Sequence, residues 1–362
     1  MVDVLPSDAA FLDLLLERGQ LSRADVAGAT TMSKPTASEA ASRLIAAGLV
    51  TELGPAQGRR GRAPQLYELN PAFGTALAII ARSDRLEMLT VNLRGETGMH
   101  VQLPLAADLS PGEFGALVDQ QATDLLEAAP GPCRAIVVSL AVPVDPRTRQ
   151  PVLQPESPFP AAQLDVLALA QRHTAGAIAV DNDVNWSAVA ACAHEVALSS
   201  GLVLHIHLGH GLGGAVSVDG RVLPGRRGAI GELGRMRAGG RSVTQRLGSL
   251  GMLHEHGYSI DVDAGAAALS GSHSELREIL AEMVANAIIL TDPEQVVFSG
   301  PLIRDRRALA GLTARVAHLL DAEAPPTTVL TWGNRAPAVG ARAAAIDLLR
   351  QAAHEVLIRP EP

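Results

Sequence analysis

The chain contains few cysteines, few aromatic residues and almost no lysine. Cys133 and Cys192 are the only cysteines among 362 residues, which argues against a disulfide framework and fits a reducing cytoplasm. Aromatic residues make up 2%, and Lys34 is the single lysine among 30 basic residues. We attribute most of this bias to coding composition, so the abundance of arginine alone does not indicate a nucleic-acid partner.

Long apolar runs and an excess of positive charge are also missing. No window holds the about 18 apolar residues that a membrane span needs, and Met1–Ala10 does not have the pattern of a signal peptide. We therefore expect a cytoplasmic protein without a membrane span. The net charge of −8 excludes a globally basic protein. A length of 362 residues is enough for two or three domains with a sizeable core.

The first 70 residues have the pattern of a winged helix-turn-helix domain. An apolar stripe predicts a first helix, a capping box at Ser22 opens a second, and Ser33 caps a third that ends before Gly48. Two strands then flank a glycine- and arginine-rich loop, the wing. The expected elements are helices at residues 8–18, 23–27 and 34–46 and strands at 49–53 and 65–69.

The third helix is expected to bind DNA through its polar face. Ala37, Ala40, Ala41, Leu44 and Ile45 share one face and should pack inward. Segment 33–62 carries five basic and two acidic residues, whereas segment 1–70 as a whole has a net charge of −1. Positive charge is therefore placed where this fold would touch the phosphates. The alternative is a winged helix used for protein contact. The candidate DNA-binding residues are Ser33, Lys34, Pro35, Thr36, Ser38, Glu39, Ser42 and Arg43 on the helix and Arg59, Arg60 and Arg62 on the wing.

The pattern changes after Asn70-Pro71 to three strands joined by short turns, followed by alternating helices and strands. This order predicts a two-lobed α/β body. The expected strands are 74–81, 86–93, 99–105, 135–142 and 177–180 in the first lobe, and 202–208, 215–218, 295–299 and 328–330 in the second. The expected helices are 111–128, 163–174, 184–198, those around 264–291 and 305–321, and 338–353.

The stretch from Ile206 to Arg235 joins a glycine-rich turn, a hairpin, an Arg-Arg-Gly loop and the sequence Gly231-Glu232-Leu233-Gly234. Glycines at such turns permit close backbone approach, which serves either a phosphate loop or tight packing. The whole pattern resembles the ROK family of repressors, open reading frames and sugar kinases. The resemblance extends over nearly the whole chain, and it implies an actin-like, ribonuclease-H-like body. It divides the chain into a winged helix-turn-helix domain (1–70), a first lobe (71–183 with 338–362) and a second lobe (184–337).

The chemistry of a ROK sugar kinase is expected to be missing. The first phosphate loop of the family, Asp-x-Gly-Gly-Thr, corresponds here to a segment without glycine, Ala78–Asp84. The second, Leu-Gly-Thr-Gly, has lost its hydroxyl and is Leu208-Gly209-His210-Gly211. Phosphoryl transfer depends almost wholly on positioning and electrostatics. We therefore expect no kinase activity, no catalytic residue and no cofactor.

The resemblance implies that a sugar would bind Asn182, Asp183, Glu232 and His254, with Arg235 in place of the family histidine. In the kinases the aspartate is the base for the sugar hydroxyl; here Asp183 either accepts a hydrogen bond from a ligand or caps the following helix. Arg226, Arg227 and Arg235 would suit an anionic group, and the simpler alternative is that they are solvated surface arginines or pair with Asp and Glu.

Structural zinc is not expected. The resemblance implies that ROK zinc ligands would be Arg235, Gln245, Leu247 and Met252, none of which is a histidine or a thiolate. Two histidine pairs, His205 with His207 and His254 with His256, lack third and fourth ligands. Ordinary hydrogen-bonded histidines are the simpler interpretation.

We therefore expect a transcriptional regulator, a repressor in the first instance, that binds double-stranded operator DNA as a homodimer or homotetramer. A non-catalytic body would sense a sugar or a sugar phosphate. Two alternatives stay open: a sugar kinase with a DNA-binding domain, and a regulator controlled by a protein partner without any sugar effector.

Overall fold

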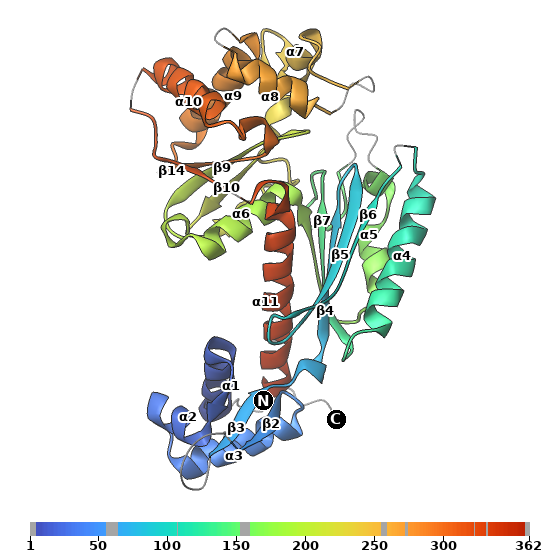
Figure 1. Cartoon of the computed structure of the whole chain (residues 1–362), viewed down its shortest axis with the longest axis vertical. Coiled ribbons are helices and arrows are strands. Elements are labelled where there is room, and N and C mark those ends of the chain that lie inside the picture. Colours follow the sequence, from blue (N-terminus) through green and yellow to red (C-terminus); the bar gives the residue numbers. More distant parts are fainter. Residues whose placement is uncertain are drawn as a thin grey trace.

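The computed structural model describes residues 5–55, 64–106, 108–152, 160–254, 259–271, 274–321, 323–330 and 332–358. It consists of a small N-terminal domain, two α/β lobes and a long C-terminal helix that runs between them (Figure 1). Among the described residues, no helix is long and apolar enough to cross a membrane.

The N-terminal domain is a winged helix, with three helices packed on a sheet of strand order β1-β3-β2. Each helix forms where a local signal starts it. Ser22 and Asp25 make a capping box, Ser33 caps the third helix, and Gly48 follows that helix with a φ of 71°. The elements are α1 (Pro6–Arg18), β1 (Leu21–Ser22), α2 (Arg23–Ala29), α3 (Lys34–Ala46), β2 (Val50–Pro55) and β3 (Gln65–Leu69).

The sequence prediction for this domain needs three corrections. Helix α1 starts two residues earlier than expected because Pro6 is favoured in the first turn. The two-residue strand β1 was not expected. Ile45, which was expected to pack inward, is exposed on α3, whereas Ala37, Ala40, Ala41 and Leu44 are buried as predicted.

The first lobe is a five-stranded sheet with order β6-β5-β4-β7-β8, in which β4, β7 and β8 are parallel. Strand β4 is buried on both faces. Leu77 and Ile79 pack toward α4 and α5, and Ala78 and Ile80 toward the C-terminal helix. The expected helix 163–174 is instead a 3-10 turn followed by the short α5. The elements are β4 (Thr75–Ala81), β5 (Arg85–Asn92), β6 (Thr97–Pro104), α4 (Pro111–Glu127), β7 (Cys133–Leu140), α5 (Val166–Gln171) and β8 (Ala177–Asn182).

The second lobe is a mixed sheet with order β11-β10-β9-β14-β15, and α8, α9 and α10 cover it (Figure 1). Its core is separate from that of the first lobe and centres on Ile206, Leu280 and Phe298. The elements are α6 (Asp183–His194), β9 (Leu202–Leu208), β10 (Leu212–Val218), β11 (Arg221–Val222), η4 (Leu233–Arg235), β12 (Arg237–Ala238), β13 (Arg241–Ser242), α7 (Val243–Ser249), α8 (Val262–Ser270), α9 (Glu275–Thr291), β14 (Gln295–Ser299), α10 (Arg306–Leu320) and β15 (Thr327–Val329).

The last helix, α11 (Ala336–Ile358), joins all three parts (Figure 1). Its 23 residues span about 35 Å at 1.5 Å per residue. It packs along α6 and on the β4–β7 face of the first lobe, and its C-terminal half reaches the winged helix domain. One continuous core therefore includes Phe11 and Leu44 of that domain together with Ala345 and Leu349 of α11. The winged helix domain therefore packs against the body through this shared core.

Candidate nucleic-acid interface and effector site

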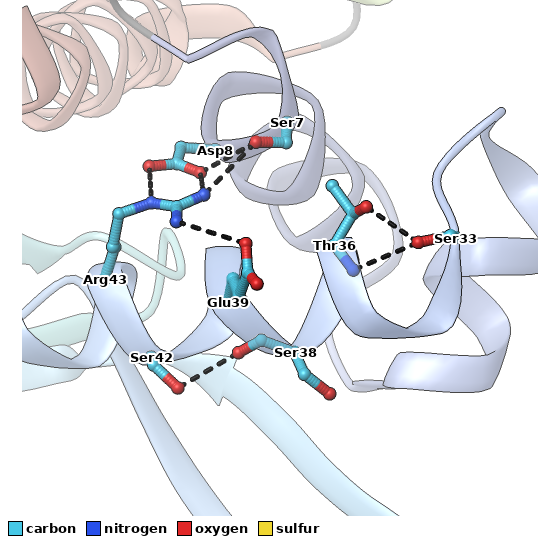
Figure 2. Close-up of polar contacts among 8 residues, drawn as sticks. All are labelled: Ser7, Asp8, Ser33, Thr36, Ser38, Glu39, Ser42 and Arg43. Atoms are coloured by element: carbon cyan, nitrogen blue, oxygen red, sulfur yellow. Dashed lines mark hydrogen bonds and ion pairs between the residues drawn. The ribbon is translucent and has the colours of Figure 1, made fainter.

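The N-terminal half of α3 is presented at the surface and is fixed by its cap. The Ser33 hydroxyl accepts a hydrogen bond from the Thr36 backbone N–H at 3.2 Å and lies 2.7 Å from the Thr36 hydroxyl (Figure 2). Ser33, Lys34, Pro35 and Glu39 are exposed, and Thr36 is half-buried. An exposed helix N-terminus that carries a lysine is suited to phosphate contact.

Arg43, a candidate DNA contact, is held by the first helix of the same domain. Its Nε and Nη2 atoms donate to the two carboxylate oxygens of Asp8 at 2.8 and 2.7 Å, and Nη2 also donates to the Ser7 hydroxyl (Figure 2). Asp8 is buried, and its hydrogen bond raises the pKa of Arg43. This two-pronged pair fixes α3 against α1, so the structure gives Arg43 an intramolecular partner.

Two other candidates on α3 also have partners inside the domain. The Ser42 hydroxyl donates to the Ser38 carbonyl at 3.0 Å, and the Ser38 hydroxyl accepts from Arg23 of α2 at 3.1 Å. The same guanidinium lies 5.2 Å from the centre of the Tyr67 ring. The wing candidates Arg59, Arg60 and Arg62 lie outside the described residues. The assignment of all these residues to DNA contact stays a prediction.

The candidate effector residues lie where the strands of the first lobe end. The register pairs Ala81 with Leu140 and Leu140 with Asn182, so β4, β7 and β8 end side by side. The residues that follow β4 and β8 are Arg82 and Asp183, which places both at the carboxyl edge where ligands of α/β sheets bind. The Asn182 side chain caps α6 by accepting from the Val184 N–H at 2.8 Å. The cap expected of Asp183 is therefore supplied by its neighbour.

Charges from both lobes act on Asp183. Burial raises the pKa of its carboxyl to about 6, the Arg82 charge lowers this pKa, and the Glu232 charge raises it. Burial also lowers the pKa of His207 to about 4, with further lowering by the charges of Arg82 and His210. The Glu232 carboxylate thus lies near enough for its charge to act on Asp183, and the assignment of both residues to an effector site stays a prediction. The structure adds Arg82, which sequence reasoning missed because only strand register aligns it with Asp183.

The other two candidate effector residues are more peripheral. Arg235 is exposed at the end of the 3-10 turn η4, and its N–H donates to the Glu232 carbonyl at 3.0 Å. His254 is exposed too, next to a segment in which the Ile260 N–H donates to the His210 carbonyl at 2.8 Å. Arg235 therefore lies beside Glu232, whereas His254 bonds through its N–H to the Ser259 carbonyl, next to the Ile260 that contacts His210.

The glycines of the second lobe serve close packing. Gly213 and Gly214, expected in the turn, lie inside β10. A Cβ atom on Gly213 would come within 2.7 Å of the Val184 side chain at the start of α6. A Cβ atom on Gly231 would lie 1.8 Å from the Gly214 carbonyl oxygen. This glycine-rich stretch was expected to serve either as a phosphate loop or in tight packing, and these contacts favour tight packing.

The region that resembles the zinc motif forms a capped helix with an apolar face. Gln245 accepts a hydrogen bond from the Ser242 N–H at 2.9 Å in a capping box that opens α7. Leu247 is fully buried and Met252 packs on the core of the second lobe. The two strand histidines bond to serines: His205 lies 3.1 Å from the Ser217 hydroxyl and His207 3.1 Å from the Ser299 hydroxyl. Within the described ranges, no three His, Cys, Asp or Glu side chains are grouped to hold a metal ion.

Comparison with solved structures defines the fold as a winged helix-turn-helix joined to an actin-like two-lobed α/β body. A ROK family transcriptional regulator described as a homologue of the E. coli MLC protein superposes with a TM-score of 0.63 at 18% identity, over 96% of this chain and 97% of that one. The ROK hexokinase from Thermus thermophilus superposes with a TM-score of 0.58 at 18% identity, over 76% of this chain and 99% of the hexokinase.

Sequence comparison finds a family domain in the middle of the chain and several relatives. Residues 112–257 match the model described as ROK family, so the chain carries a ROK family domain. An N-acetyl-D-glucosamine kinase of Erwinia tasmaniensis is 30% identical over 187 residues, which are 41% of this chain and 60% of the kinase. The xylose repressor of Caldicellulosiruptor bescii is 23% identical over 249 residues, 67% of this chain and 61% of the repressor. The matches thus span about 60% of the length of these curated relatives.

Proposed function

We propose that this protein is a DNA-binding transcriptional regulator, a repressor of genes for sugar uptake or metabolism, with a non-catalytic body. One observation carries the proposal. A winged helix domain with an exposed recognition helix shares a continuous core with a sugar-kinase-like body. A sensor and a DNA-binding domain that share a core respond to the same conformational change. The chain is proposed to act in the cytoplasm as a homodimer or homotetramer, because one winged helix alone gives too small a contact for tight specific binding.

The rival function is a sugar kinase, which the match to the N-acetyl-D-glucosamine kinase favours. Against it stands Arg82, at the end of β4 where the resemblance places the first phosphate loop. Its side chain is 12% exposed and acts on the pKa of both Asp183 and His207. A guanidinium there replaces the glycine backbone and the metal-linked carboxylate that phosphoryl transfer needs. An assay with ATP, Mg²⁺ and a panel of hexoses, pentoses and N-acetylhexosamines should give no turnover. Turnover abolished by Asp183→Asn would establish the kinase.

The body is proposed to sense a sugar or a sugar phosphate near Asn182, Asp183 and Glu232. A ligand that touches both lobes favours one relative position of the lobes, and only such differential affinity shifts an equilibrium. Helix α6 begins at Asp183 and packs along α11, which contacts the winged helix domain. Helices α6 and α11 therefore connect the proposed effector site to the domain that carries the proposed DNA-binding surface.

Calorimetry with sugars and sugar phosphates tests the effector site. Asp183→Ala and Glu232→Ala should each reduce the affinity of a bound ligand by about tenfold or more, since each removes a charged hydrogen-bond acceptor. Asp219→Ala, at the β10–β11 turn, is the control. An inducer that binds both site variants unchanged would place the effector site elsewhere. Absence of binding by every sugar would favour control by a protein partner.

DNA binding is tested with variants of the wing. Arg59→Ala with Arg60→Ala should weaken binding to all sequences, and the slope of log affinity against log salt should flatten by about one per lost phosphate contact. The control is Arg172→Ala with Arg85→Ala, which also removes two exposed arginines but from the body. Truncation is a poor test, because removal of the body would expose the shared core. If both double variants lose affinity and salt dependence equally, the wing is not the contact.

A further inference from the structure

Most polar side chains on the outer face of α3 have hydrogen-bond partners within the winged helix domain. Ser33 and Thr36 bond to each other, Ser42 bonds to the Ser38 carbonyl, and Arg43 pairs with Asp8 (Figure 2). These side chains form hydrogen bonds that stabilise α3 and its packing in the domain. They leave two exposed charged residues on α3, Lys34 at its first position and Glu39 in its middle.

Glu39 projects from the face of α3 that carries the candidate DNA contacts. Its side chain is 72% exposed, and its contact with Arg43 is a loose one, with 4.0 Å between Oε2 and Nη1. By comparison, the Asp8–Arg43 atoms are 2.7 Å apart. Arg43 is thus held mainly by Asp8, so the Glu39 carboxylate is able to turn toward a ligand without loosening the domain. Pro35 and Ser42 lie on the same side of the helix, one turn before and about one turn after it.

An ionised carboxylate only accepts hydrogen bonds, and this limits what it selects in a major groove. Guanine presents two acceptors there and thymine one acceptor with a methyl group, and all of these repel or exclude a carboxylate. Adenine presents an amino donor beside the acceptor N7. Cytosine presents its N4 amino donor, and a carboxylate is its matching partner.

We propose that Glu39 is a specificity-determining residue that selects a cytosine in each half-site of the operator by accepting a hydrogen bond from its N4 amino group. The inference rests on the proposed DNA-binding function and adds the base that this helix selects. It also explains how an acidic residue fits on a surface that must approach phosphates. The carboxylate weakens binding to most sequences, and binding is tight only where an amino donor of the base lies opposite it.

Selection of the full-length protein against a pool of random DNA duplexes, followed by sequencing, tests the proposal. Wild-type protein should enrich sequences with a fixed cytosine, and replacement of that base should weaken binding roughly tenfold or more. Glu39→Gln should change the preferred base at this position from cytosine to adenine, because a glutamine amide pairs with adenine N6 and N7. Glu39→Ala should lose the preference there and keep it elsewhere. Glu17→Gln on α1, which removes an acid of similar exposure, should leave the selected sequence unchanged.

Each outcome supports or overturns the inference. If wild type, Glu39→Gln and Glu39→Ala all select one sequence, Glu39 does not contact a base, and the inference fails while the proposed regulator stands. If the selected sequence has no cytosine that depends on Glu39, the result is the same. If wild-type protein enriches no sequence while its thermal unfolding shows a folded protein, both the proposed function and the inference fail.

Discussion

Gly340 of α11 lies against the backbone of Trp186 in α6, so close that a Cβ atom on the glycine would come within 1.8 Å of the Trp186 carbonyl oxygen. Trp186 is itself anchored, because its indole N–H donates to the Val138 carbonyl of β7 at 3.0 Å. Helices α6 and α11 thus cross with their backbones in close contact. This crossing joins the first residues of α6, at the proposed effector site, to the helix that reaches the winged helix domain.

Gly340→Ala should therefore destabilise the protein strongly. The added methyl group must push the two helices apart or displace the side chains packed between them. Overpacking of this kind lowers the free energy of unfolding by about 1–3 kcal/mol or more. The midpoint of urea unfolding, followed by circular dichroism, should fall clearly. Gly112→Ala in α4 is the matched control, since a Cβ there meets no atom within 4 Å and alanine favours a helix. Equal midpoints for both variants would mean that α6 and α11 are not in the described contact.

Arg94 connects the winged helix domain to the first lobe. It forms an ion pair with Glu68 of β3, and its Nε donates to the Leu69 carbonyl at 3.0 Å. Glu68 is buried, so Arg94→Ala would leave a buried carboxylate without its main partner, at a cost of about 1–3 kcal/mol. We expect the winged helix domain to unfold or exchange amide protons before the body does. Arg85→Ala, whose guanidinium pairs with exposed Asp84 next to it, should leave amide exchange of β3 unchanged.

The Asp8–Arg43 pair gives a prediction that replaces a simpler one from the sequence. On sequence grounds, substitution of Arg43 should change base preference. Because Arg43 holds α1 against α3, we now expect Arg43→Ala to lower stability by about 1 kcal/mol and DNA affinity to a similar extent for every sequence. Asp8→Ala should lower stability and DNA affinity to the same extent. The double variant should lose less stability than the sum of the losses in the two single variants. Altered base preference in Arg43→Ala, with Asp8→Ala unchanged, would return Arg43 to the DNA contacts.

Elements with a local signal were predictable from the sequence. Ser33 starts α3 through a hydrogen bond three residues away, and β9 and β14 are short apolar runs whose ends agree with the structure at Leu202–Leu208 and Gln295–Ser299. The winged helix and the two-lobed body follow from such elements in order. The grouping of Asp183 with Glu232 followed from the family resemblance. The Glu232 charge raises the pKa of Asp183, and the role of both residues in binding an effector stays a prediction.

Features that depend on distant residues were not predictable in the same way. The Asp8–Arg43 pair joins residues 35 positions apart. Arg82 and Asp183 lie at the same edge of the sheet because β7 pairs with both β4 and β8. Gly213 was expected in a turn, but the neighbouring Val184 side chain is the reason for a glycine inside β10. Ile45 has the helical spacing of a core residue and is exposed, since the period of α3 does not show where the buried face ends.

The raised pKa of Asp183 predicts how stability depends on pH. Its carboxyl has a pKa of about 6 in the folded protein against 3.8 as the ordinary value. The folded state therefore binds the proton more tightly, and this contribution to stability is full below pH 3.8 and is lost as the pH rises through 6. The Asp183→Asn variant has no such charge and should not lose this contribution. Its free energy of unfolding should therefore exceed that of wild type by about 1–3 kcal/mol above pH 7 and by little at pH 4.

Asp145→Asn is a control whose pH dependence should run in the opposite direction. Backbone N–H donors lower the pKa of Asp145, so its carboxylate stabilises the fold only at higher pH. The measurement is the difference in unfolding midpoint between each variant and wild type from pH 4 to pH 8. A difference for Asp183→Asn that stays constant over this range would show that the carboxyl ionises at its ordinary pKa, and that Arg82 offsets its burial in full.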